Sequence, residues 1–211
     1  MSGQLPELPV PRGDFHIEDP WRVPSGCTLQ PLLRSADGAP PRLASAVTAY
    51  HDGARLYVLF QTSDEGIVAT KVDHDDSLYQ EDVVELFLAP ETQNRYFEIE
   101  INPLGAVFDA RVDSPDGDRR TMKVDIGWQC TGLQVAIRRT WENDRRFLGE
   151  VLTIVPFAAL DAAVRSGTSW FANFYRIDRA ASGDEFTAWS PTGRTPPDFH
   201  VPARFGRLVF L

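Results

Sequence analysis

The chain has 211 residues, of which 43% are hydrophobic and 24% charged, so its composition is that of an ordinary globular protein and its length fits one all-β domain or two small ones. The formal net charge is −9 and no basic run occurs, which argues against nucleic acid as a partner. No stretch approaches the roughly 18 apolar residues that a membrane-spanning helix needs, so we expect no membrane partner either.

Residues 1–42 are rich in proline and glycine and poor in periodic pattern. We predict that they form an extended lead-in, with one short strand near residues 27–33, packed on a single domain over residues 43–211. The N-terminus lacks the charged start and apolar stretch of a secretory signal, so we expect a cytoplasmic protein or one whose leader has been removed. Cys27 and Cys130 could pair, although two distant cysteines are more often free and buried.

Residues 44–51 and 55–62 flank the turn Asp52-Gly53, which predicts a hairpin because a DG pair between two strand-like runs favours a tight turn. The loop that follows, over residues 64–82, is dense in carboxylates. Calcium takes six to eight oxygen ligands, so a structural calcium at Asp64 and Asp82 is one interpretation of this loop. A solvated acidic loop is the other, since the spacing does not match the helix-loop-helix calcium motif.

Residues 79–113 contain three runs that alternate with the two-residue period of a strand, joined by short turns at 90–94 and 102–105. We predict a three-stranded meander with one apolar face and one face that carries carboxylates, an amide and a guanidinium. Such a face, flanked by aromatic rings, is a plausible sugar-binding surface, but antiparallel sheets also commonly leave one face in water. The candidate polar groups are Glu85, Glu98, Glu100 and Asn102.

Later strands are predicted over residues 121–130, 133–140, 149–155, 170–178 and 185–189, and a closing strand ends the chain. The first two of these are expected to form a hairpin around Thr131-Gly132. Residues 156–164 are the one helical run, with Pro156 in the first turn and Gly167 beyond the end. About ten to twelve short strands and one short helix favour an all-β, antiparallel, jelly-roll-like β-sandwich over any α/β layout.

Five motifs occur in order along the chain, and they read LYQEDVVELFLAP, YFEIEINPLG, ANFYRID, AWSP and FHVPARFGRLVF. Together they resemble the family 9 carbohydrate-binding modules and their stand-alone relatives, over residues 44–211. The resemblance implies an antiparallel β-sandwich that binds a mono- or oligosaccharide without catalysis, between two stacking aromatic rings, in the context of polysaccharide catabolism. Some members also hold calcium in loops as structural support, but no cofactor is required for binding.

The resemblance assigns Tyr79 and Trp189 as the two stacking rings and Glu85 as the carboxylate that bonds sugar hydroxyls. The xylanase-borne modules have an arginine in the next strand, where this chain has Glu98. That exchange would change which sugar hydroxyls find a hydrogen-bond partner, and the added carboxylate would repel acidic sugars. In the matching late strand, Asn173 and Arg176 are further ligand-binding candidates.

Each of these residues also has a purely structural interpretation, and the sequence leaves both open. Trp189 could be a core residue and Tyr79 could anchor its loop. Arg176 could form an internal ion pair with Asp178.

Three other functions compete with sugar binding. A glycoside hydrolase, or a weakly hydrolytic domain associated with one, would use paired carboxylates, and Glu85, Glu98 and Glu100 share one face. A structural accessory domain whose site has decayed would account for the departures at Tyr79 and Glu98. A haem-binding sandwich would need an axial histidine or methionine, for which the candidates are His51, His74, His200 and Met122.

Overall fold

The structure is a computed structural model that describes residues 4–143, 146–180 and 183–211. Its strands are β1 (Glu7–Val10), β2 (Gln30–Pro31), β3 (Leu33–Arg34), β4 (Ser45–His51), β5 (Arg55–Asp64), β6 (Val83–Ala89), β7 (Arg95–Ile101), β8 (Val107–Asp113), β9 (Lys123–Asp125), β10 (Gln134–Asn143), β11 (Arg146–Pro156), β12 (Ser169–Asp178), β13 (Glu185–Ala188) and β14 (Gly206–Phe210).

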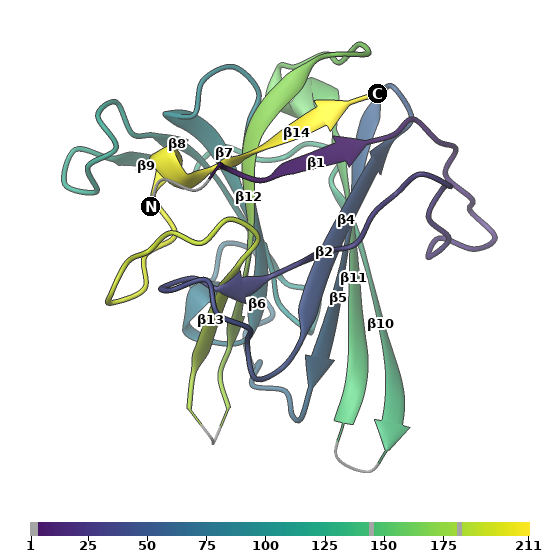
Figure 1. Cartoon of the computed structure of the whole chain (residues 1–211), viewed down its shortest axis with the longest axis vertical. Helices are drawn as coiled ribbons and strands as arrows, with labels where there is room; N and C mark the ends of the chain where they lie inside the picture. The colour runs from purple at the N-terminus through teal and green to yellow at the C-terminus, as the bar shows by residue number, and fades with distance from the viewer. Residues whose placement is uncertain (1–3, 144–145, 181–182) are drawn as a thin grey trace.

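These strands form two sheets that face each other as a β-sandwich (Figure 1). The larger sheet has nine strands in the order β1-β14-β12-β6-β7-β8-β9, with β13 added to β12 and β3 added to β13. The smaller sheet has five strands in the order β10-β11-β5-β4-β2. The predicted fold class is confirmed. Among the described residues, no helix is long and apolar enough to cross a membrane.

The predicted meander is present as β6, β7 and β8, each paired antiparallel with the next. The predicted hairpin at Asp52-Gly53 joins β4 to β5. Its turn forms because Asp52 Oδ1 accepts the N–H groups of Ala54 and Arg55 at 2.8 and 2.7 Å, while Gly53 adopts φ 97°, a conformation that favours glycine.

The hairpin predicted at Thr131-Gly132 is wrong. β9 pairs with β8 in the larger sheet, whereas β10 pairs with β11 in the smaller one, so this stretch crosses between sheets. The backbone N–H of Cys130 donates to Asp109 Oδ2 at 3.0 Å and ties the crossing to β8. The predicted helix is a single 3-10 turn, Phe157–Leu160, which ends where Asp161 turns left-handed at φ 49°.

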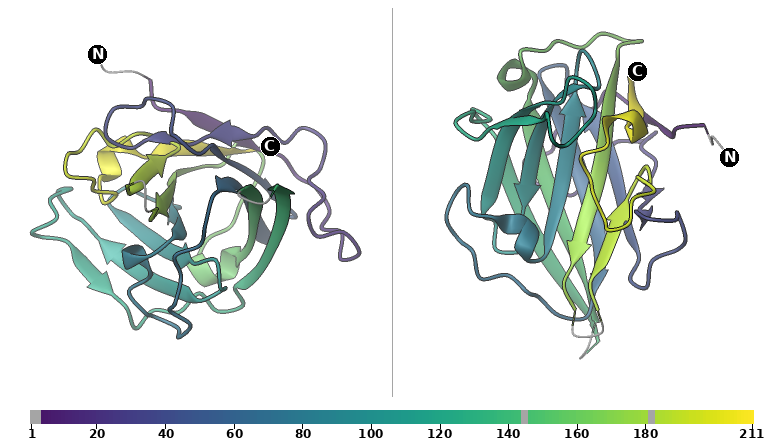
Figure 2. Two further views of the ribbon diagram at one scale, coloured as in Figure 1. Left: turned by 90° about the horizontal axis from the view of Figure 1, so that it is seen from below. Right: turned by 90° about the vertical axis from the view of Figure 1, so that its left-hand side faces the viewer.

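Residues 4–42 contribute three short strands to the sheets as well as an extended segment. β1 pairs parallel with β14, while β2 and β3 extend the smaller and the larger sheet (Figures 1 and 2). Phe15 and Trp21 pack on the outer face of the smaller sheet, with the Arg138 guanidinium 4.6 Å from the Trp21 ring centre. Cys27 and Cys130 are both free thiols.

The main core lies between the two sheets and includes the inward residues of the meander, such as Val84, Leu86 and Ile99. A second apolar cluster covers the outer face of the larger sheet, and it includes Phe87, Tyr175, Phe199 and Phe205. Phe199 and Phe205 belong to the arm that precedes β14, so the end of the chain folds back over this face. Figure 2 shows that arm running over the nine-stranded sheet.

Candidate functional site

Three glutamates converge on the outer face of the larger sheet. Glu85 on β6 lies directly opposite Glu100 on β7, and Glu98 lies two residues before Glu100 on the same strand. Side chains two residues apart share a face, and directly opposed residues have Cβ atoms about 4.5–5.5 Å apart, so the strand register itself brings the three together. One carboxylate oxygen of each lies within 4.8 Å of the other two.

All three glutamates are buried, with exposed fractions of 2% for Glu85, 5% for Glu98 and 3% for Glu100. The interpretation of this face as a solvated sheet surface is therefore wrong at these positions. The glutamates line a cavity of about 320 Å³ that opens to the surface. The cavity is also lined by side chains from loops and from β8, among them Tyr79, Phe108, Arg119, Arg179, Phe199 and His200.

Burial changes the acidity of this group. Desolvation, followed by repulsion from the neighbouring glutamates, raises the pKa of Glu85 and of Glu100 well above the usual value. Desolvation also raises the pKa of Glu98 to about 7. In the part of the chain that the structure describes, none of the three forms an ion pair with a lysine or an arginine.

His200 is the basic side chain that contacts the glutamates, with Nε2 3.7 Å from Glu98 Oε1. Burial lowers the pKa of His200 to about 4, so the ring is neutral at pH 7 and does not offset their charge. Its Nδ1 lies 2.7 Å from the Tyr96 hydroxyl, which also donates to Met122 Sδ at 3.6 Å. Both candidate haem ligands at the cavity are therefore held by Tyr96.

The rings of Tyr79 and Phe199 border the cavity from different segments. Tyr79 lies in the 3-10 turn Leu78–Gln80, whose Leu78 is buried, and its own side chain is 52% exposed. Arg179 Nη2 donates to the Tyr79 carbonyl at 2.7 Å and fixes this turn. Phe199 stacks on Tyr175, with ring centres 4.1 Å apart and planes at 11°.

The predicted second ring, Trp189, is not at the cavity, and this assignment is corrected. Trp189 is 3% exposed and belongs to the core between the sheets, 5.6 Å from the Phe174 ring centre. Gly206 permits this packing, because a Cβ at that position would lie 2.5 Å from the Trp189 ring. The alternation of β13 placed the tryptophan inside, and nothing in the local sequence distinguished the two faces.

The assignment of Asn102 and Asn173 as ligand-binding residues is also corrected, because both side-chain amides form hydrogen bonds with the backbone. Asn102 Oδ1 accepts the N–H groups of Leu104 and Ala106 at 3.0 and 2.9 Å and shapes the turn between β7 and β8. Asn173 Oδ1 accepts the N–H of Ser190 at 2.9 Å, and its Nδ2 donates to the Ser190 carbonyl at 2.8 Å. Both residues are fully buried, which leaves no group to meet a ligand.

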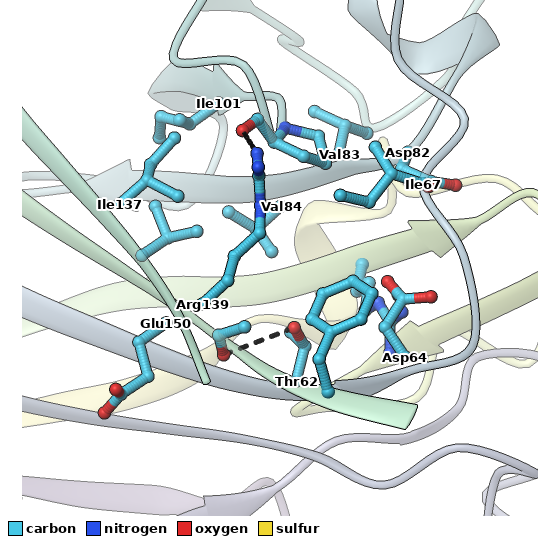
Figure 3. Close-up of a pocket in the computed structure, with 15 residues that line it drawn as sticks. Thr62, Asp64, Ile67, Asp82, Val83, Val84, Ile101, Ile137, Arg139 and Glu150 are labelled. Carbon is cyan, nitrogen blue, oxygen red and sulfur yellow. Dashed lines mark hydrogen bonds and ion pairs between the residues drawn. The ribbon is translucent and has the colours of Figure 1, made fainter. Parts of the chain in front are cut away.

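Arg176 is an interior residue of β12 and does not line the glutamate cavity. Its Nη2 donates to Asp64 Oδ2 at 2.9 Å and to Asp178 Oδ1 at 3.2 Å. The internal ion pair that the sequence left as an alternative is confirmed. A different and much smaller cleft, of about 40 Å³, lies between the two sheets and is lined by Arg176, Asp64 and Asp82. Arg139 extends across this cleft and donates to the Pro103 carbonyl (Figure 3).

The three aspartates beside this cleft do not fit a calcium ion. Asp64, Asp82 and Asp178 offer oxygens within 4.8 Å of one another. Each of their six oxygens already accepts a hydrogen bond, from backbone N–H groups at Asp82, from backbone and Arg176 at Asp64, and from Arg176 and Arg42 at Asp178. Two guanidinium groups supply the positive charge that a calcium ion would bring.

Phe199 and Phe108 line the cavity but were not predicted from the sequence. Phe199 lies within the FHVPARFGRLVF motif, but a ring in a proline-flanked arm gives no local sign of which element it covers. Phe108 lies opposite Glu100 in the strand register, so it shares the outer face with the glutamates. Knowledge of the β7–β8 register would have placed it there.

The sequence matches the profile of carbohydrate-binding family 9 over residues 27–210. The chain belongs to carbohydrate-binding family 9. No curated protein matches it.

Solved structures share the fold of this family 9 chain. One is a protein from Bacteroides uniformis ATCC 8492 described as a candidate carbohydrate-binding protein, with 22% identity, a TM-score of 0.74 and 100% coverage of both chains. Another is a family 9 module from Caldicellulosiruptor kristjanssonii in complex with glucose, with 15% identity, a TM-score of 0.63, and coverage of 98% of this chain and 96% of that one. The cellotriose complex of a family 9 module from the same organism gives 14% identity, a TM-score of 0.60, and coverage of 97% and 93%.

We expect Arg176→Ala to destabilise this family 9 domain strongly. The change would leave Asp64 and Asp178 buried without the guanidinium that pairs with them, and removing one partner of a buried ion pair costs about 3–5 kcal/mol. The matched control is Arg111→Ala, which breaks the exposed pair with Asp125 and should cost about 0–1 kcal/mol. Urea unfolding measures both, and equal losses in the two variants would contradict the interior role of Arg176.

We expect Glu100→Gln to stabilise the sugar-free protein at pH 8. The raised pKa values mean that the folded state holds more protons than the unfolded state above the ordinary carboxyl pKa, so stability falls as pH rises through about 7. A neutral isostere at position 100 removes the contribution of that carboxyl to the loss, so the variant should be more stable than wild type at pH 8 and the difference should shrink at pH 5. Thermal unfolding at pH 5 and pH 8 tests this, with the exposed Glu18→Gln as control. A Glu100→Gln variant less stable than wild type at pH 8 would refute it.

Proposed function

We propose that this chain is a non-catalytic carbohydrate-binding domain, and that the cavity on the outer face of the larger sheet holds one saccharide unit. The observation that carries the proposal is the cavity itself: buried carboxylates and exposed aromatic surface line one open space of about 320 Å³. Binding sites for small molecules have volumes of about 300–1,000 Å³ and combine apolar walls with a few convergent polar groups.

The rings would meet the flat C–H faces of a sugar. Such contact removes apolar surface from water at about 25 cal/mol per Å². Phe199 is held against Tyr175, so its ring offers a fixed wall. The Tyr79 ring is half exposed on a turn that Arg179 holds in place, and it loses little freedom when a ligand covers it. Tyr79 and Phe199 thus replace the pair of Tyr79 and Trp189 in the proposed site.

The glutamates would meet the hydroxyls. Carboxylate oxygens accept hydrogen bonds from hydroxyl groups, and Glu100 Oε2 is buried without a partner. A buried acceptor left unsatisfied costs about 1–3 kcal/mol, so a ligand that satisfies it gains that much over one that does not. The glucose and cellotriose complexes of related modules support a neutral saccharide as the basic ligand class.

We expect Tyr79→Ala to weaken binding of glucose and cellotriose at least about tenfold, a loss of about 1.4 kcal/mol, because the exposed ring forms one wall of the site. Isothermal titration calorimetry measures this. The matched control is Trp141→Ala, since Trp141 is 64% exposed on β10 of the other sheet. Equal affinities of wild type and Tyr79→Ala for these sugars would show that the cavity is not the saccharide-binding site.

The glycosidase alternative also uses the glutamates, so it needs its own test. Acid–base hydrolysis requires one carboxyl that is protonated and another that is ionised, which environments of opposite effect provide. Here burial shifts the pKa of Glu85, Glu98 and Glu100 in the same direction. The contact between Glu98 and Glu100 in addition lowers the pKa of Glu98 and raises that of Glu100, so a measurement of turnover, rather than acidity, distinguishes the two functions.

We expect the protein to release no nitrophenol from p-nitrophenyl β-D-glucoside above the buffer rate between pH 5 and pH 8. Absorbance at high protein concentration measures the release. The control for contaminating hydrolase is Glu85→Gln purified in the same way. Turnover by wild type that disappears in Glu85→Gln would establish hydrolysis and overturn the non-catalytic assignment.

A further inference from the structure

The glutamate cavity groups three buried carboxyls to which the described part of the protein offers no lysine or arginine ion pair. Glu85, Glu98 and Glu100 are buried together, and within the described residues their one basic contact is the neutral His200. Grouping carboxylates in this way costs stability, since each disfavours ionisation of the others. Asp64 and Asp178 differ from the glutamates in this respect, because each is paired with the buried Arg176.

The two arginines that line the cavity are already engaged elsewhere. Arg119 Nη1 lies 2.6 Å from Asp198 Oδ1. Arg179 pairs with Asp184 and donates to the Tyr79 carbonyl. Each guanidinium is therefore matched by a carboxylate of its own, and among the described residues neither forms an ion pair with one of the three glutamates.

One glutamate oxygen in the cavity is available as a hydrogen-bond acceptor. Glu100 Oε2 is buried and has no hydrogen-bond partner, on a side chain that lines the cavity. Such an atom is free to accept a hydrogen bond from a ligand in the cavity. A positively charged donor is the strongest available, since hydrogen bonds between charged groups are roughly twice as strong as neutral ones.

The three glutamates lie close enough together for one ammonium group to contact all of them. Its three N–H bonds point tetrahedrally, and oxygens held at about 2.8 Å by two of them are about 4.6 Å apart. One oxygen from each of Glu85, Glu98 and Glu100 lies within 4.8 Å of the others. The remainder of the wall is aromatic, from Tyr79, Phe108, Phe186 and Phe199. A bare metal ion would leave that wall unused, whereas a sugar ring would cover it.

We propose that the cavity selects a saccharide unit that carries a free, protonated amino group, with the ammonium held by Glu85, Glu98 and Glu100 and the ring packed against the aromatic wall. This inference rests on the proposed function and narrows its ligand class to amino sugars. Acetylation of the amine removes both its charge and two of its donors, so the same unit in N-acetylated form lacks the selected feature.

The test is calorimetric titration of the purified chain at pH 7 with D-glucosamine, D-glucose and N-acetyl-D-glucosamine. We expect glucosamine to bind at least tenfold more tightly than glucose, and N-acetylglucosamine to bind no more tightly than glucose. Raising the salt concentration should reduce the preference for glucosamine, because it screens charge. Glu98→Gln and Glu100→Gln should each bring the ratio of the two affinities towards one, while Glu18→Gln should leave it unchanged.

The outcomes separate the two proposals. If glucose and glucosamine bind equally, the amino-sugar inference fails and the proposed function stands. If neither these sugars nor any glycan on an array binds, both fail. Titration with calcium, magnesium and zinc chlorides is the remaining arm: a divalent ion that binds wild type, not Glu100→Gln, and blocks glucosamine would show a metal site and overturn the inference. Retention of the preference in Glu98→Gln and Glu100→Gln, both folded by circular dichroism, would also overturn it.

Discussion

The antiparallel register between β6 and β7 is the constraint on which the site depends. It sets Glu85 opposite Glu100 and places Glu98 beside them. A slip of β7 by one residue would turn Glu98 and Glu100 into the sandwich and bring Ile99 out, at the cost of the main core. The hydrophobic requirement that stabilises the sandwich therefore also fixes the position of the polar group.

Burial of that polar group depends on a second apolar layer. The outer face of a sheet is usually in contact with water, but here Phe87, Tyr96 and Tyr175 pack under Phe199 and Phe205. Tyr175 donates to the Phe199 carbonyl at 2.9 Å and so fixes the arm as well as the ring. The arm thus converts an open sheet face into a walled cavity, and the desolvation that raises the glutamate pKa values follows from it.

Two acidic clusters in one domain have opposite characters. In the first cluster every carboxylate oxygen of Asp64, Asp82 and Asp178 accepts a hydrogen bond. Arg176 and Arg42 are among the donors, so these bonds connect segments that lie far apart in the chain. Glu85, Glu98 and Glu100 share a cavity with an unpartnered oxygen and without a guanidinium of their own. A satisfied cluster stabilises the fold, whereas an unsatisfied one is retained at a cost in stability. That difference distinguishes the cluster with a structural role from the one that we propose to bind a saccharide.

The sequence by itself determined the sandwich, the meander and the hairpin at Asp52-Gly53, because alternation and turn residues act over a few neighbours. It also identified Tyr79 and the three glutamates as the polar and aromatic components of one face. It did not determine whether Trp189, Asn173 and Arg176 point to the ligand or to the interior, and it gave no sign that Phe199 covers β12. Only the tertiary structure decided those points, because they depend on which strands become neighbours and on how the last arm folds over the sheet, and contacts of that kind join residues far apart in the chain.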